Sequence, residues 1–156
     1  MRAVRYRQGR ESARGYYEDA YDFDSLRDLA LIPLGAGGSR RYATRVHDLE
    51  TDETVREWAA APGDAVVLFA ATFLQRDNLR DYWDEVIYLD ASIEQAQARG
   101  IARDAAALGG PDNAAEAYET RYMAACKIYL AEQRPRERAS ILIEHDDPAD
   151  PRLIRG

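Results

Sequence analysis

The sequence predicts an α/β fold, a parallel sheet flanked by helices. Residues 64–69 and 85–90 are apolar runs without alternation, as expected of parallel strands that helices cover on both faces. A third apolar run, 139–143, follows a long helical pattern, so predicted strands and helices alternate along the chain. The chain has 156 residues, of which 46% are hydrophobic, which suits one compact core, so residues 1–156 are predicted to form a single domain.

The first sixty residues contribute little to this predicted sheet. Residues 1–15 have no sustained periodicity and are predicted to be a loop. A short amphipathic helix is expected to begin at Asp22 and to end at Pro33, because proline cannot continue a helix. The other predicted pieces are a turn at 35–39, an irregular strand at 42–49 and a helix at 52–60.

Helices separate the predicted strands in the second half of the chain. Residues 76–83 fit a short helix between the first two strands. Ser92 is suited to cap the next helix, which ends at Gly109-Gly110-Pro111. A longer helical pattern covers 113–134 and stops at Pro135, and an acidic tail follows the last strand.

Composition argues against several classes of protein. The net charge of −7 disfavours a general nucleic-acid-binding surface, because phosphate backbones attract positive charge. The longest apolar run, 65–71, is far shorter than the roughly 20 residues that cross a bilayer, so we expect a cytoplasmic protein without membrane contact. The single cysteine, Cys126, excludes an internal disulfide and a cysteine-based zinc cage. Its apolar helical context favours a structural thiol, and no metal site is expected.

Short pieces in a fixed order resemble the uridine kinase family of P-loop phosphotransferases across about residues 5–154. They are the segments 5–12, 15–17, 19–22, 33–42, 73–76, 79–80, 83–84, 99–104 and 129–130, together with Asp48 and Pro135. The resemblance implies a P-loop NTPase-like fold that binds ATP with Mg²⁺. It also implies transfer of the γ-phosphate to a hydroxyl of a nucleoside or similar small molecule.

The resemblance implies a substrate side around residues 15–48. Tyr42 and His47 have the spacing of a tyrosine and a histidine that contact the nucleoside base in relatives. Tyr17 and Asp19 lie in the segment that precedes them and are further substrate-binding candidates. The alternatives are a surface histidine beside Asp48, ordinary packing for Tyr17, and a structural role for the acidic residues near Asp19.

The resemblance also implies a lid of arginines that closes over phosphates. Arg99 and Arg103 lie four residues apart, hence on one helical face, and Arg121 is a weaker candidate of the same kind. The alternative for Arg103 is an ion pair with Asp104 on a solvated surface.

Three catalytic parts of that family are missing from this sequence. The phosphate-binding motif G-x-x-x-x-G-K-[ST] does not occur, since the only lysine, Lys127, lies in a helical pattern without a preceding glycine. Residues 35–39 are a phosphate cradle only as a minor alternative to an ordinary turn. The catalytic carboxylate of relatives would precede Arg5, and Ala70 stands where relatives have an acidic residue.

The chain is therefore expected to be an N-terminally incomplete domain, inactive as it stands. Either Met1 is an internal start or the chain is a degenerate relative that lost ATP chemistry. Loss of a central strand would expose sheet edges, so a homo-oligomer is an expected partner besides a nucleoside or nucleotide. The alternative function is a non-catalytic nucleotide-binding domain or an oligomerising subunit.

Overall fold

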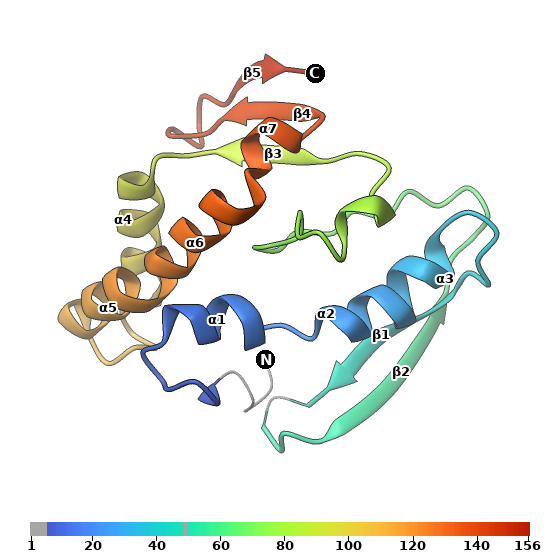
Figure 1. The fold of residues 1–156 in the computed structure, drawn as a ribbon, viewed down its shortest axis with the longest axis horizontal. Helices are drawn as coiled ribbons and strands as arrows, with labels where there is room; N and C mark the ends of the chain where they lie inside the picture. Colours follow the sequence, from blue (N-terminus) through green and yellow to red (C-terminus); the bar gives the residue numbers. More distant parts are fainter. Residues whose placement is uncertain (1–5, 49) are drawn as a thin grey trace.

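The computed structural model describes residues 6–48 and 50–156, which form two small sheets and two groups of helices (Figure 1). The first group is α1 (Ala13–Asp19) followed by α2 (Phe23–Leu26), the π-helical turn η2 (Arg27–Leu31) and α3 (Ile32–Leu34). The second group is α4 (Ile93–Asp104), α5 (Pro111–Ala117), the π-helical turn η4 (Tyr118–Tyr122), α6 (Met123–Gln133) and α7 (Pro135–Arg138).

Side-chain caps explain where the N-terminal helices begin. The Ser12 hydroxyl accepts a hydrogen bond from the backbone N–H of Gly15 (2.9 Å), which starts α1 within the predicted loop 1–15. The loop prediction is wrong there because the stability of α1 comes from packing against α6, which a local pattern does not reveal. The Asp22 carboxylate caps α2 as predicted, and the helical run ends at Gly35, after Pro33. Residues 1–5 lie outside the described residues.

The strands β1 (Arg41–His47) and β2 (Thr54–Ala60) form an antiparallel hairpin. The strand prediction for 42–49 is confirmed through His47, whereas the helix prediction for 52–60 is wrong. Cross-strand contacts favour the strand: the Arg45 guanidinium donates to Glu57 (3.0 Å), and Arg41 lies 4.6 Å from the centre of the Trp58 ring.

The predicted buried strand at 64–69 is wrong. These residues have no regular secondary structure, and Val66 and Leu68 are 87% and 88% exposed. A strand needs a neighbouring backbone for its hydrogen bonds, and no described strand lies beside this segment. The predicted helix at 76–83 is reduced to the 3₁₀ turn η3 (Arg80–Tyr82).

The second sheet has the strand order β3 (Ile87–Asp90), β4 (Ile141–Glu144), β5 (Arg152–Arg155). β3 and β4 form at two of the three strands predicted for a parallel sheet and pair in parallel, but β5 pairs antiparallel to β4, so the sheet is mixed and not wholly parallel. The sequence pattern does not predict β5. Its four residues, Arg-Leu-Ile-Arg, follow the acidic tail directly and are too few to show a strand pattern.

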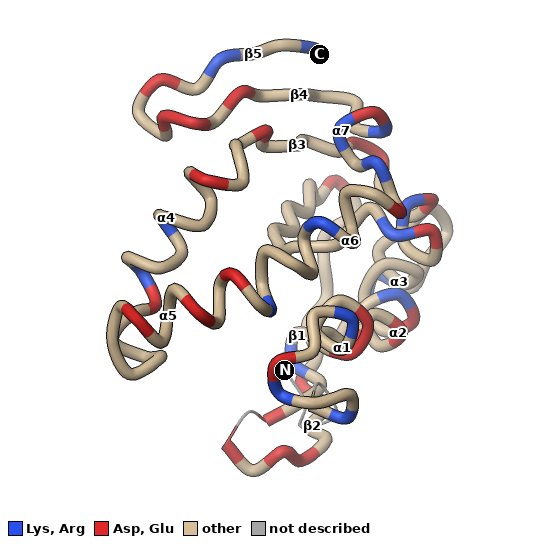
Figure 2. The backbone as a smooth tube through the Cα atoms, turned by 60° about the vertical axis from the view of Figure 1, so that its left-hand side comes forward, with Lys and Arg blue, Asp and Glu red and all other residues tan. Residues whose placement is uncertain are grey.

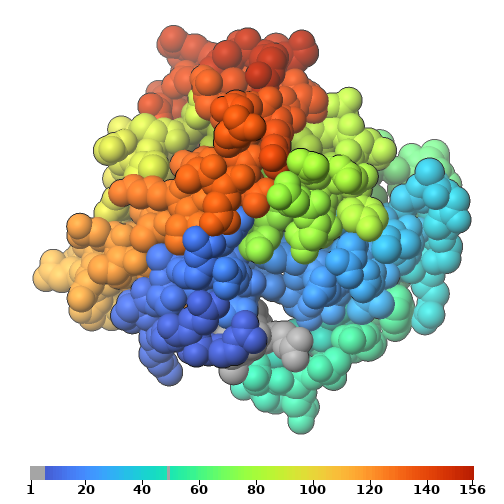
Figure 3. Space-filling model, in the orientation of Figure 1, coloured from blue at the N-terminus to red at the C-terminus, as the bar shows by residue number. Residues whose placement is uncertain are grey.

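The C-terminal helices lie where they are predicted, although α4 already ends at Asp104, five residues before Gly109. Ser92 caps α4, and the helical run from Pro111 ends at Arg134, whose left-handed φ of 45° leads into Pro135. In the space-filling view, the N-terminal helices lie against the 110–135 helices, and the segment after residue 72 fills the angle between them (Figure 3). None of the described helices is long and apolar enough to cross a membrane.

An aromatic core joins the two helix groups. Phe73, only 2% exposed, lies at its centre with ring centroids 5.3 Å from both Tyr17 and Tyr129. Trp83 and Cys126 pack against this core, as the structural role predicted for Cys126 requires. The remaining buried members are Phe23, Leu31, Leu79 and Ala125.

Candidate functional site

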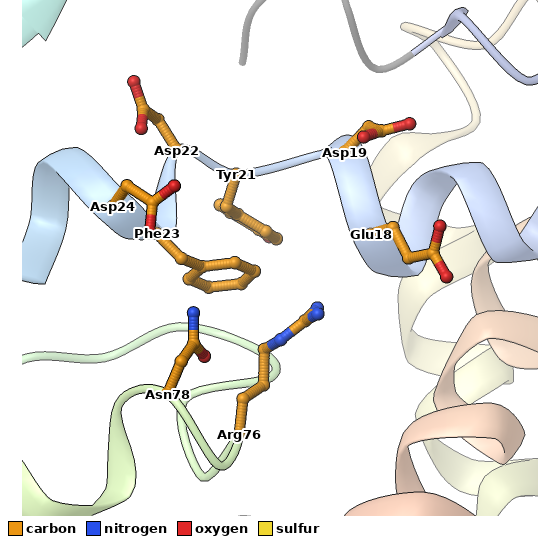
Figure 4. Close-up of a pocket in the computed structure, with 8 residues that line it drawn as sticks. All are labelled: Glu18, Asp19, Tyr21, Asp22, Phe23, Asp24, Arg76 and Asn78. Atoms are coloured by element: carbon orange, nitrogen blue, oxygen red, sulfur yellow. The ribbon is translucent and has the colours of Figure 1, made fainter.

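A hollow of about 230 Å³ lies between the α1–α2 junction and the loop at 76–78 (Figure 4). Helix α1 ends at Asp19 and α2 begins after Asp22, so two helix ends bring carboxylates to one place. The residues that line it are Glu18, Asp19, Tyr21, Asp22, Phe23, Asp24, Arg76 and Asn78.

Arg76 holds the two sides of the hollow together. Its guanidinium donates to the backbone carbonyl of Tyr17 (2.6 Å) and lies 4.3 Å and 4.8 Å from the ring centres of Tyr17 and Phe23. These contacts hold the guanidinium against two aromatic faces. Figure 4 shows Arg76 and Asn78 rising from their loop toward the Tyr21 and Phe23 rings.

Asp19 is the most enclosed of the ion-paired acids of the hollow, with a side chain 11% exposed. It accepts hydrogen bonds from the Arg7 guanidinium (2.8 Å) and from the Gln8 amide (3.0 Å). Arg7 is itself 65% exposed, so the arm formed by Arg7 and Gln8 lies over the carboxylate from the solvent side. A ligand rich in hydroxyl or amide donors would satisfy the same acceptors.

The other two aspartates of the hollow also serve the local fold. Asp22 accepts from the backbone N–H and the hydroxyl of Ser25 (3.0 Å and 2.9 Å), and Asp24 pairs with Arg27 (3.0 Å). Asp22 is the N-cap of α2 and Asp24 lies in its first turn, which agrees with the structural alternative for the acidic residues near Asp19.

The remaining substrate-side candidates lie elsewhere. Tyr17 is 2% exposed and its hydroxyl accepts from Gln133 (3.2 Å), so packing accounts for it. Tyr42 and His47 lie on β1, and neither lines the hollow. His47 is no surface histidine: its side chain is 10% exposed, and Nε2 lies 3.0 Å from the carboxylate of Asp52. A second hollow, of about 500 Å³, lies at the hairpin end and is lined by Arg45, His47, Asp48 and Glu50.

The predicted lid arginines are all engaged within the fold. Arg99 donates to the carbonyl of His145 (3.1 Å). Arg103 donates to both carboxylate oxygens of Asp104 (2.8 Å and 2.9 Å), the ion pair that the alternative predicts. The two residues lie four apart on α4, as the spacing requires.

Arg121 differs from the other two because it is 7% exposed. Its guanidinium lies 4.9–5.5 Å from the ring centres of Tyr6, Tyr16 and Tyr122. Its Nε has no hydrogen-bond partner among the described residues. Aromatic faces therefore hold this cation in the helical core.

One hydrogen-bonded cluster on α4 and η4 shifts pKa values. The Arg103 guanidinium and the Tyr118 hydroxyl both donate to Asp104 and lower the pKa of its carboxyl to about 2. Burial, followed by the bond to Asp104, raises the pKa of Tyr118 to about 12. The cluster ties η4 to α4.

The residues expected to serve ATP and Mg²⁺ do not form such a site. Within 6–48 and 50–156, no three His, Cys, Asp or Glu side chains come together in a metal-binding geometry. Ala70 lies in the exposed coil, and Lys127 lies exposed on α6. Magnesium in nucleotide sites is held by one or two carboxylates besides the phosphates, and the side chain of Ala70 supplies none.

Sequence reasoning finds Asp19 but overlooks the side chains that face it across the hollow. Arg76 belongs to a segment that carries the family resemblance, yet only the fold brings it within reach of Tyr17 and Phe23. Tyr21 belongs to the segment 19–22 that carries the resemblance, whereas Asn78 and Glu18 carry no sequence signal that separates them from other surface residues.

A comparison with solved structures gives one relevant likeness. The chain is similar to a structure described as a possible uridine kinase from Bacillus stearothermophilus, with a TM-score of 0.64 and 25% sequence identity. The match covers 90% of this chain and 64% of that chain, so this chain spans about two thirds of its length. No family model and no curated protein matches the sequence. The fold of this chain is uridine kinase-like.

Proposed function

We propose that this chain carries the acceptor-binding half of a nucleoside kinase-like phosphotransferase and binds the sugar hydroxyls of a nucleoside in the hollow at Asp19. The observation that carries the proposal is the enclosed Asp19 carboxylate, which accepts two side-chain hydrogen bonds at the mouth of the hollow. The likeness to a possible uridine kinase supports uridine as the first ligand to try.

The chemistry of the hollow favours a neutral polyol over an anion. Four carboxylates and one guanidinium line the hollow, and the arginines that pair with Asp19 and Asp24 are already engaged, so a phosphorylated ligand would have to compete with carboxylates for these cations. Hydroxyl groups donate well to carboxylates, and such charge-assisted bonds are the stronger ones in proteins. A volume of about 230 Å³ lies below the roughly 300–1,000 Å³ of usual ligand pockets and suits a pentose better than a whole nucleotide.

Binding without phosphoryl transfer is the activity we propose for the chain itself. The sequence has no phosphate-binding motif, and Ala70 offers no carboxylate for a metal-bound water. The arginines Arg99, Arg103 and Arg121 stay candidate lid residues, and each would first have to leave its present contacts. The domain would then act as a nucleoside-binding module derived from a kinase fold.

Calorimetric titration with uridine and with ribose tests this proposal. Asp19→Asn removes the charge of the acceptor and is expected to weaken binding about tenfold or more, given 1.5–3 kcal/mol for a charged hydrogen bond. Asp64→Asn, an exposed acid away from the hollow, is the matched control and should leave the affinity unchanged.

Titrations with Mg²⁺ and an assay with MgATP test whether the chain binds a nucleoside without transferring phosphate. Binding should be the same with and without Mg²⁺, and no phosphorylated product should form with MgATP. If Asp19→Asn bound uridine with the affinity of the wild type, the nucleoside would bind outside the hollow. If the wild type bound neither uridine nor ribose, the proposed function would be refuted.

A further inference from the structure

The sheet β3-β4-β5 has two open edges in the described part of the chain. β4 lies in the middle, so β3 and β5 each use only one side of their backbone for strand pairing. Apolar side chains stand exposed on both: Ile87 and Leu89 are 55% and 51% exposed, and Leu153 and Ile154 are 70% and 50% exposed. An open edge with exposed apolar side chains is a template for another strand.

The two edge strands themselves carry charges of opposite sign, although the loop before β5 is acidic. Five acidic residues and no basic residue lie between Asp81 and Glu94, around β3. β5 instead begins with Arg152 and ends with Arg155. Figure 2 shows this contrast, with basic residues at both ends of β5 and acidic residues after β3.

We propose that β5 of one copy pairs with β3 of a second copy, so that the chain associates head to tail through its sheet edges. β3 runs parallel to β4 and β5 antiparallel, so copies stacked in one orientation bring β5 antiparallel to the next β3. In the register that places Arg152 opposite Asp90, Leu153 faces Leu89 and Ile154 faces Tyr88.

The same register brings Arg155 opposite Ile87 and diagonal to Glu85. Arg152 and Asp90 now pair within their own chain, with Asp150 and Arg136 (both 2.7 Å), at sites open enough to share a further partner. Apolar and opposite-charge pairs across strands are the contacts that stabilise a sheet.

Like edges do not match in this way. Antiparallel pairing of β5 with a second β5 puts Arg152 opposite Arg155, and pairing of β3 with a second β3 puts Asp90 diagonal to Glu85. Like charges across strands are destabilising. Charge therefore selects the unlike pair, which leaves one free edge at each end and allows growth beyond a dimer.

Two edge-blocking variants test this arrangement by sedimentation velocity over a range of concentrations. Leu89→Lys blocks β3 and Leu153→Lys blocks β5, since a charged side chain on an edge prevents pairing. The wild type is expected to associate as concentration rises, whereas each variant alone stays at the 17.6 kDa of one chain. An equal mixture of the two variants is expected to form a species of twice that mass, because one intact β5 and one intact β3 remain.

Controls keep the outcomes distinct. Leu68→Lys changes an 88% exposed side chain outside both edges and should associate like the wild type. Circular dichroism checks folding, and Ile87→Lys replaces Leu89→Lys if that variant unfolds. Concentration-dependent protection of the 87–90 and 152–155 amides in hydrogen exchange is the expected second signature.

Four results would overturn the proposal. They are a wild type that stays monomeric at every concentration, association of either variant alone, a mixture without heterodimer, and loss of association in Leu68→Lys.

Discussion

Gly100→Ala is expected to destabilise the protein although it adds a better helix former. Gly100 lies inside α4, where alanine is usually more stable by about 0.5–1 kcal/mol. A Cβ atom at this position would lie 2.1 Å from Cε1 of the Tyr118 ring. Tyr118 is 5% exposed and its hydroxyl bonds to Asp104 (2.6 Å), so the ring has little room to move away.

The magnitude follows from two opposing terms. Overpacking of a filled site costs typically 1–3 kcal/mol, and the helix gain offsets part of it, so we expect a net loss of about 1–2 kcal/mol. In a Tyr118→Ala background the ring is gone, and Gly100→Ala should instead stabilise by about 0.5–1 kcal/mol. The coupling energy between the two positions is then about 2 kcal/mol.

Urea unfolding followed by circular dichroism measures all four corners of this cycle. Equal m-values across the variants would show that the differences come from stability alone. If Gly100→Ala raised the unfolding midpoint with Tyr118 in place, the close contact between the two residues would be refuted.

Three further predictions concern single side chains. The folded pKa of Asp104, about 2, lies below the ordinary value, so its stabilising contribution is present above about pH 4 and disappears toward pH 2. In Asp104→Asn, the free energy of unfolding should depend less on pH between about pH 4 and pH 2 than in the wild type, as measured by an acid titration. Phe73 has a left-handed φ of 65°. Phe73→Ala should lower the free energy of unfolding by about 3–5 kcal/mol, and Phe73→Gly by about 1 kcal/mol less, because glycine adopts this backbone conformation without strain. This order is the reverse of the usual one, and urea unfolding measures it. Burial raises the pKa of the Cys126 thiol, so alkylation at pH 8 should be much slower than for a free thiol and should accelerate in urea; equal rates would contradict its placement against the core.

Local signals in the sequence predict the helices better than the strands. Asp22 and Ser92 cap helices as expected, because a cap depends on neighbours three residues away. The segment 64–69 has the composition of a buried strand, but a strand also requires a partner from elsewhere in the chain. Residues 54–60 pair with β1 through contacts such as Arg45 with Glu57, which no helical periodicity reveals.

In the candidate site, too, local sequence signals identify some residues, whereas others are brought there only by tertiary contacts. Asp19 is identified through a resemblance carried by nearby residues, whereas Arg76 reaches the hollow through a fold contact with Tyr17, 59 positions away. The lid candidates Arg99 and Arg103 have the expected spacing, but the partners that hold them follow from tertiary structure.

The side chains of Arg7 and Gln8 occupy the Asp19 carboxylate in the free protein and therefore compete with a ligand for it. Any hydroxylated ligand of that carboxylate must first exchange with donors from the same chain, so the apparent affinity equals the intrinsic one scaled by the fraction of molecules with the arm released. An exposed ion pair is worth at most about 1 kcal/mol, which corresponds to roughly a fivefold reduction. A ligand in the hollow would therefore raise the fraction of molecules in which the arm of Arg7 and Gln8 is released.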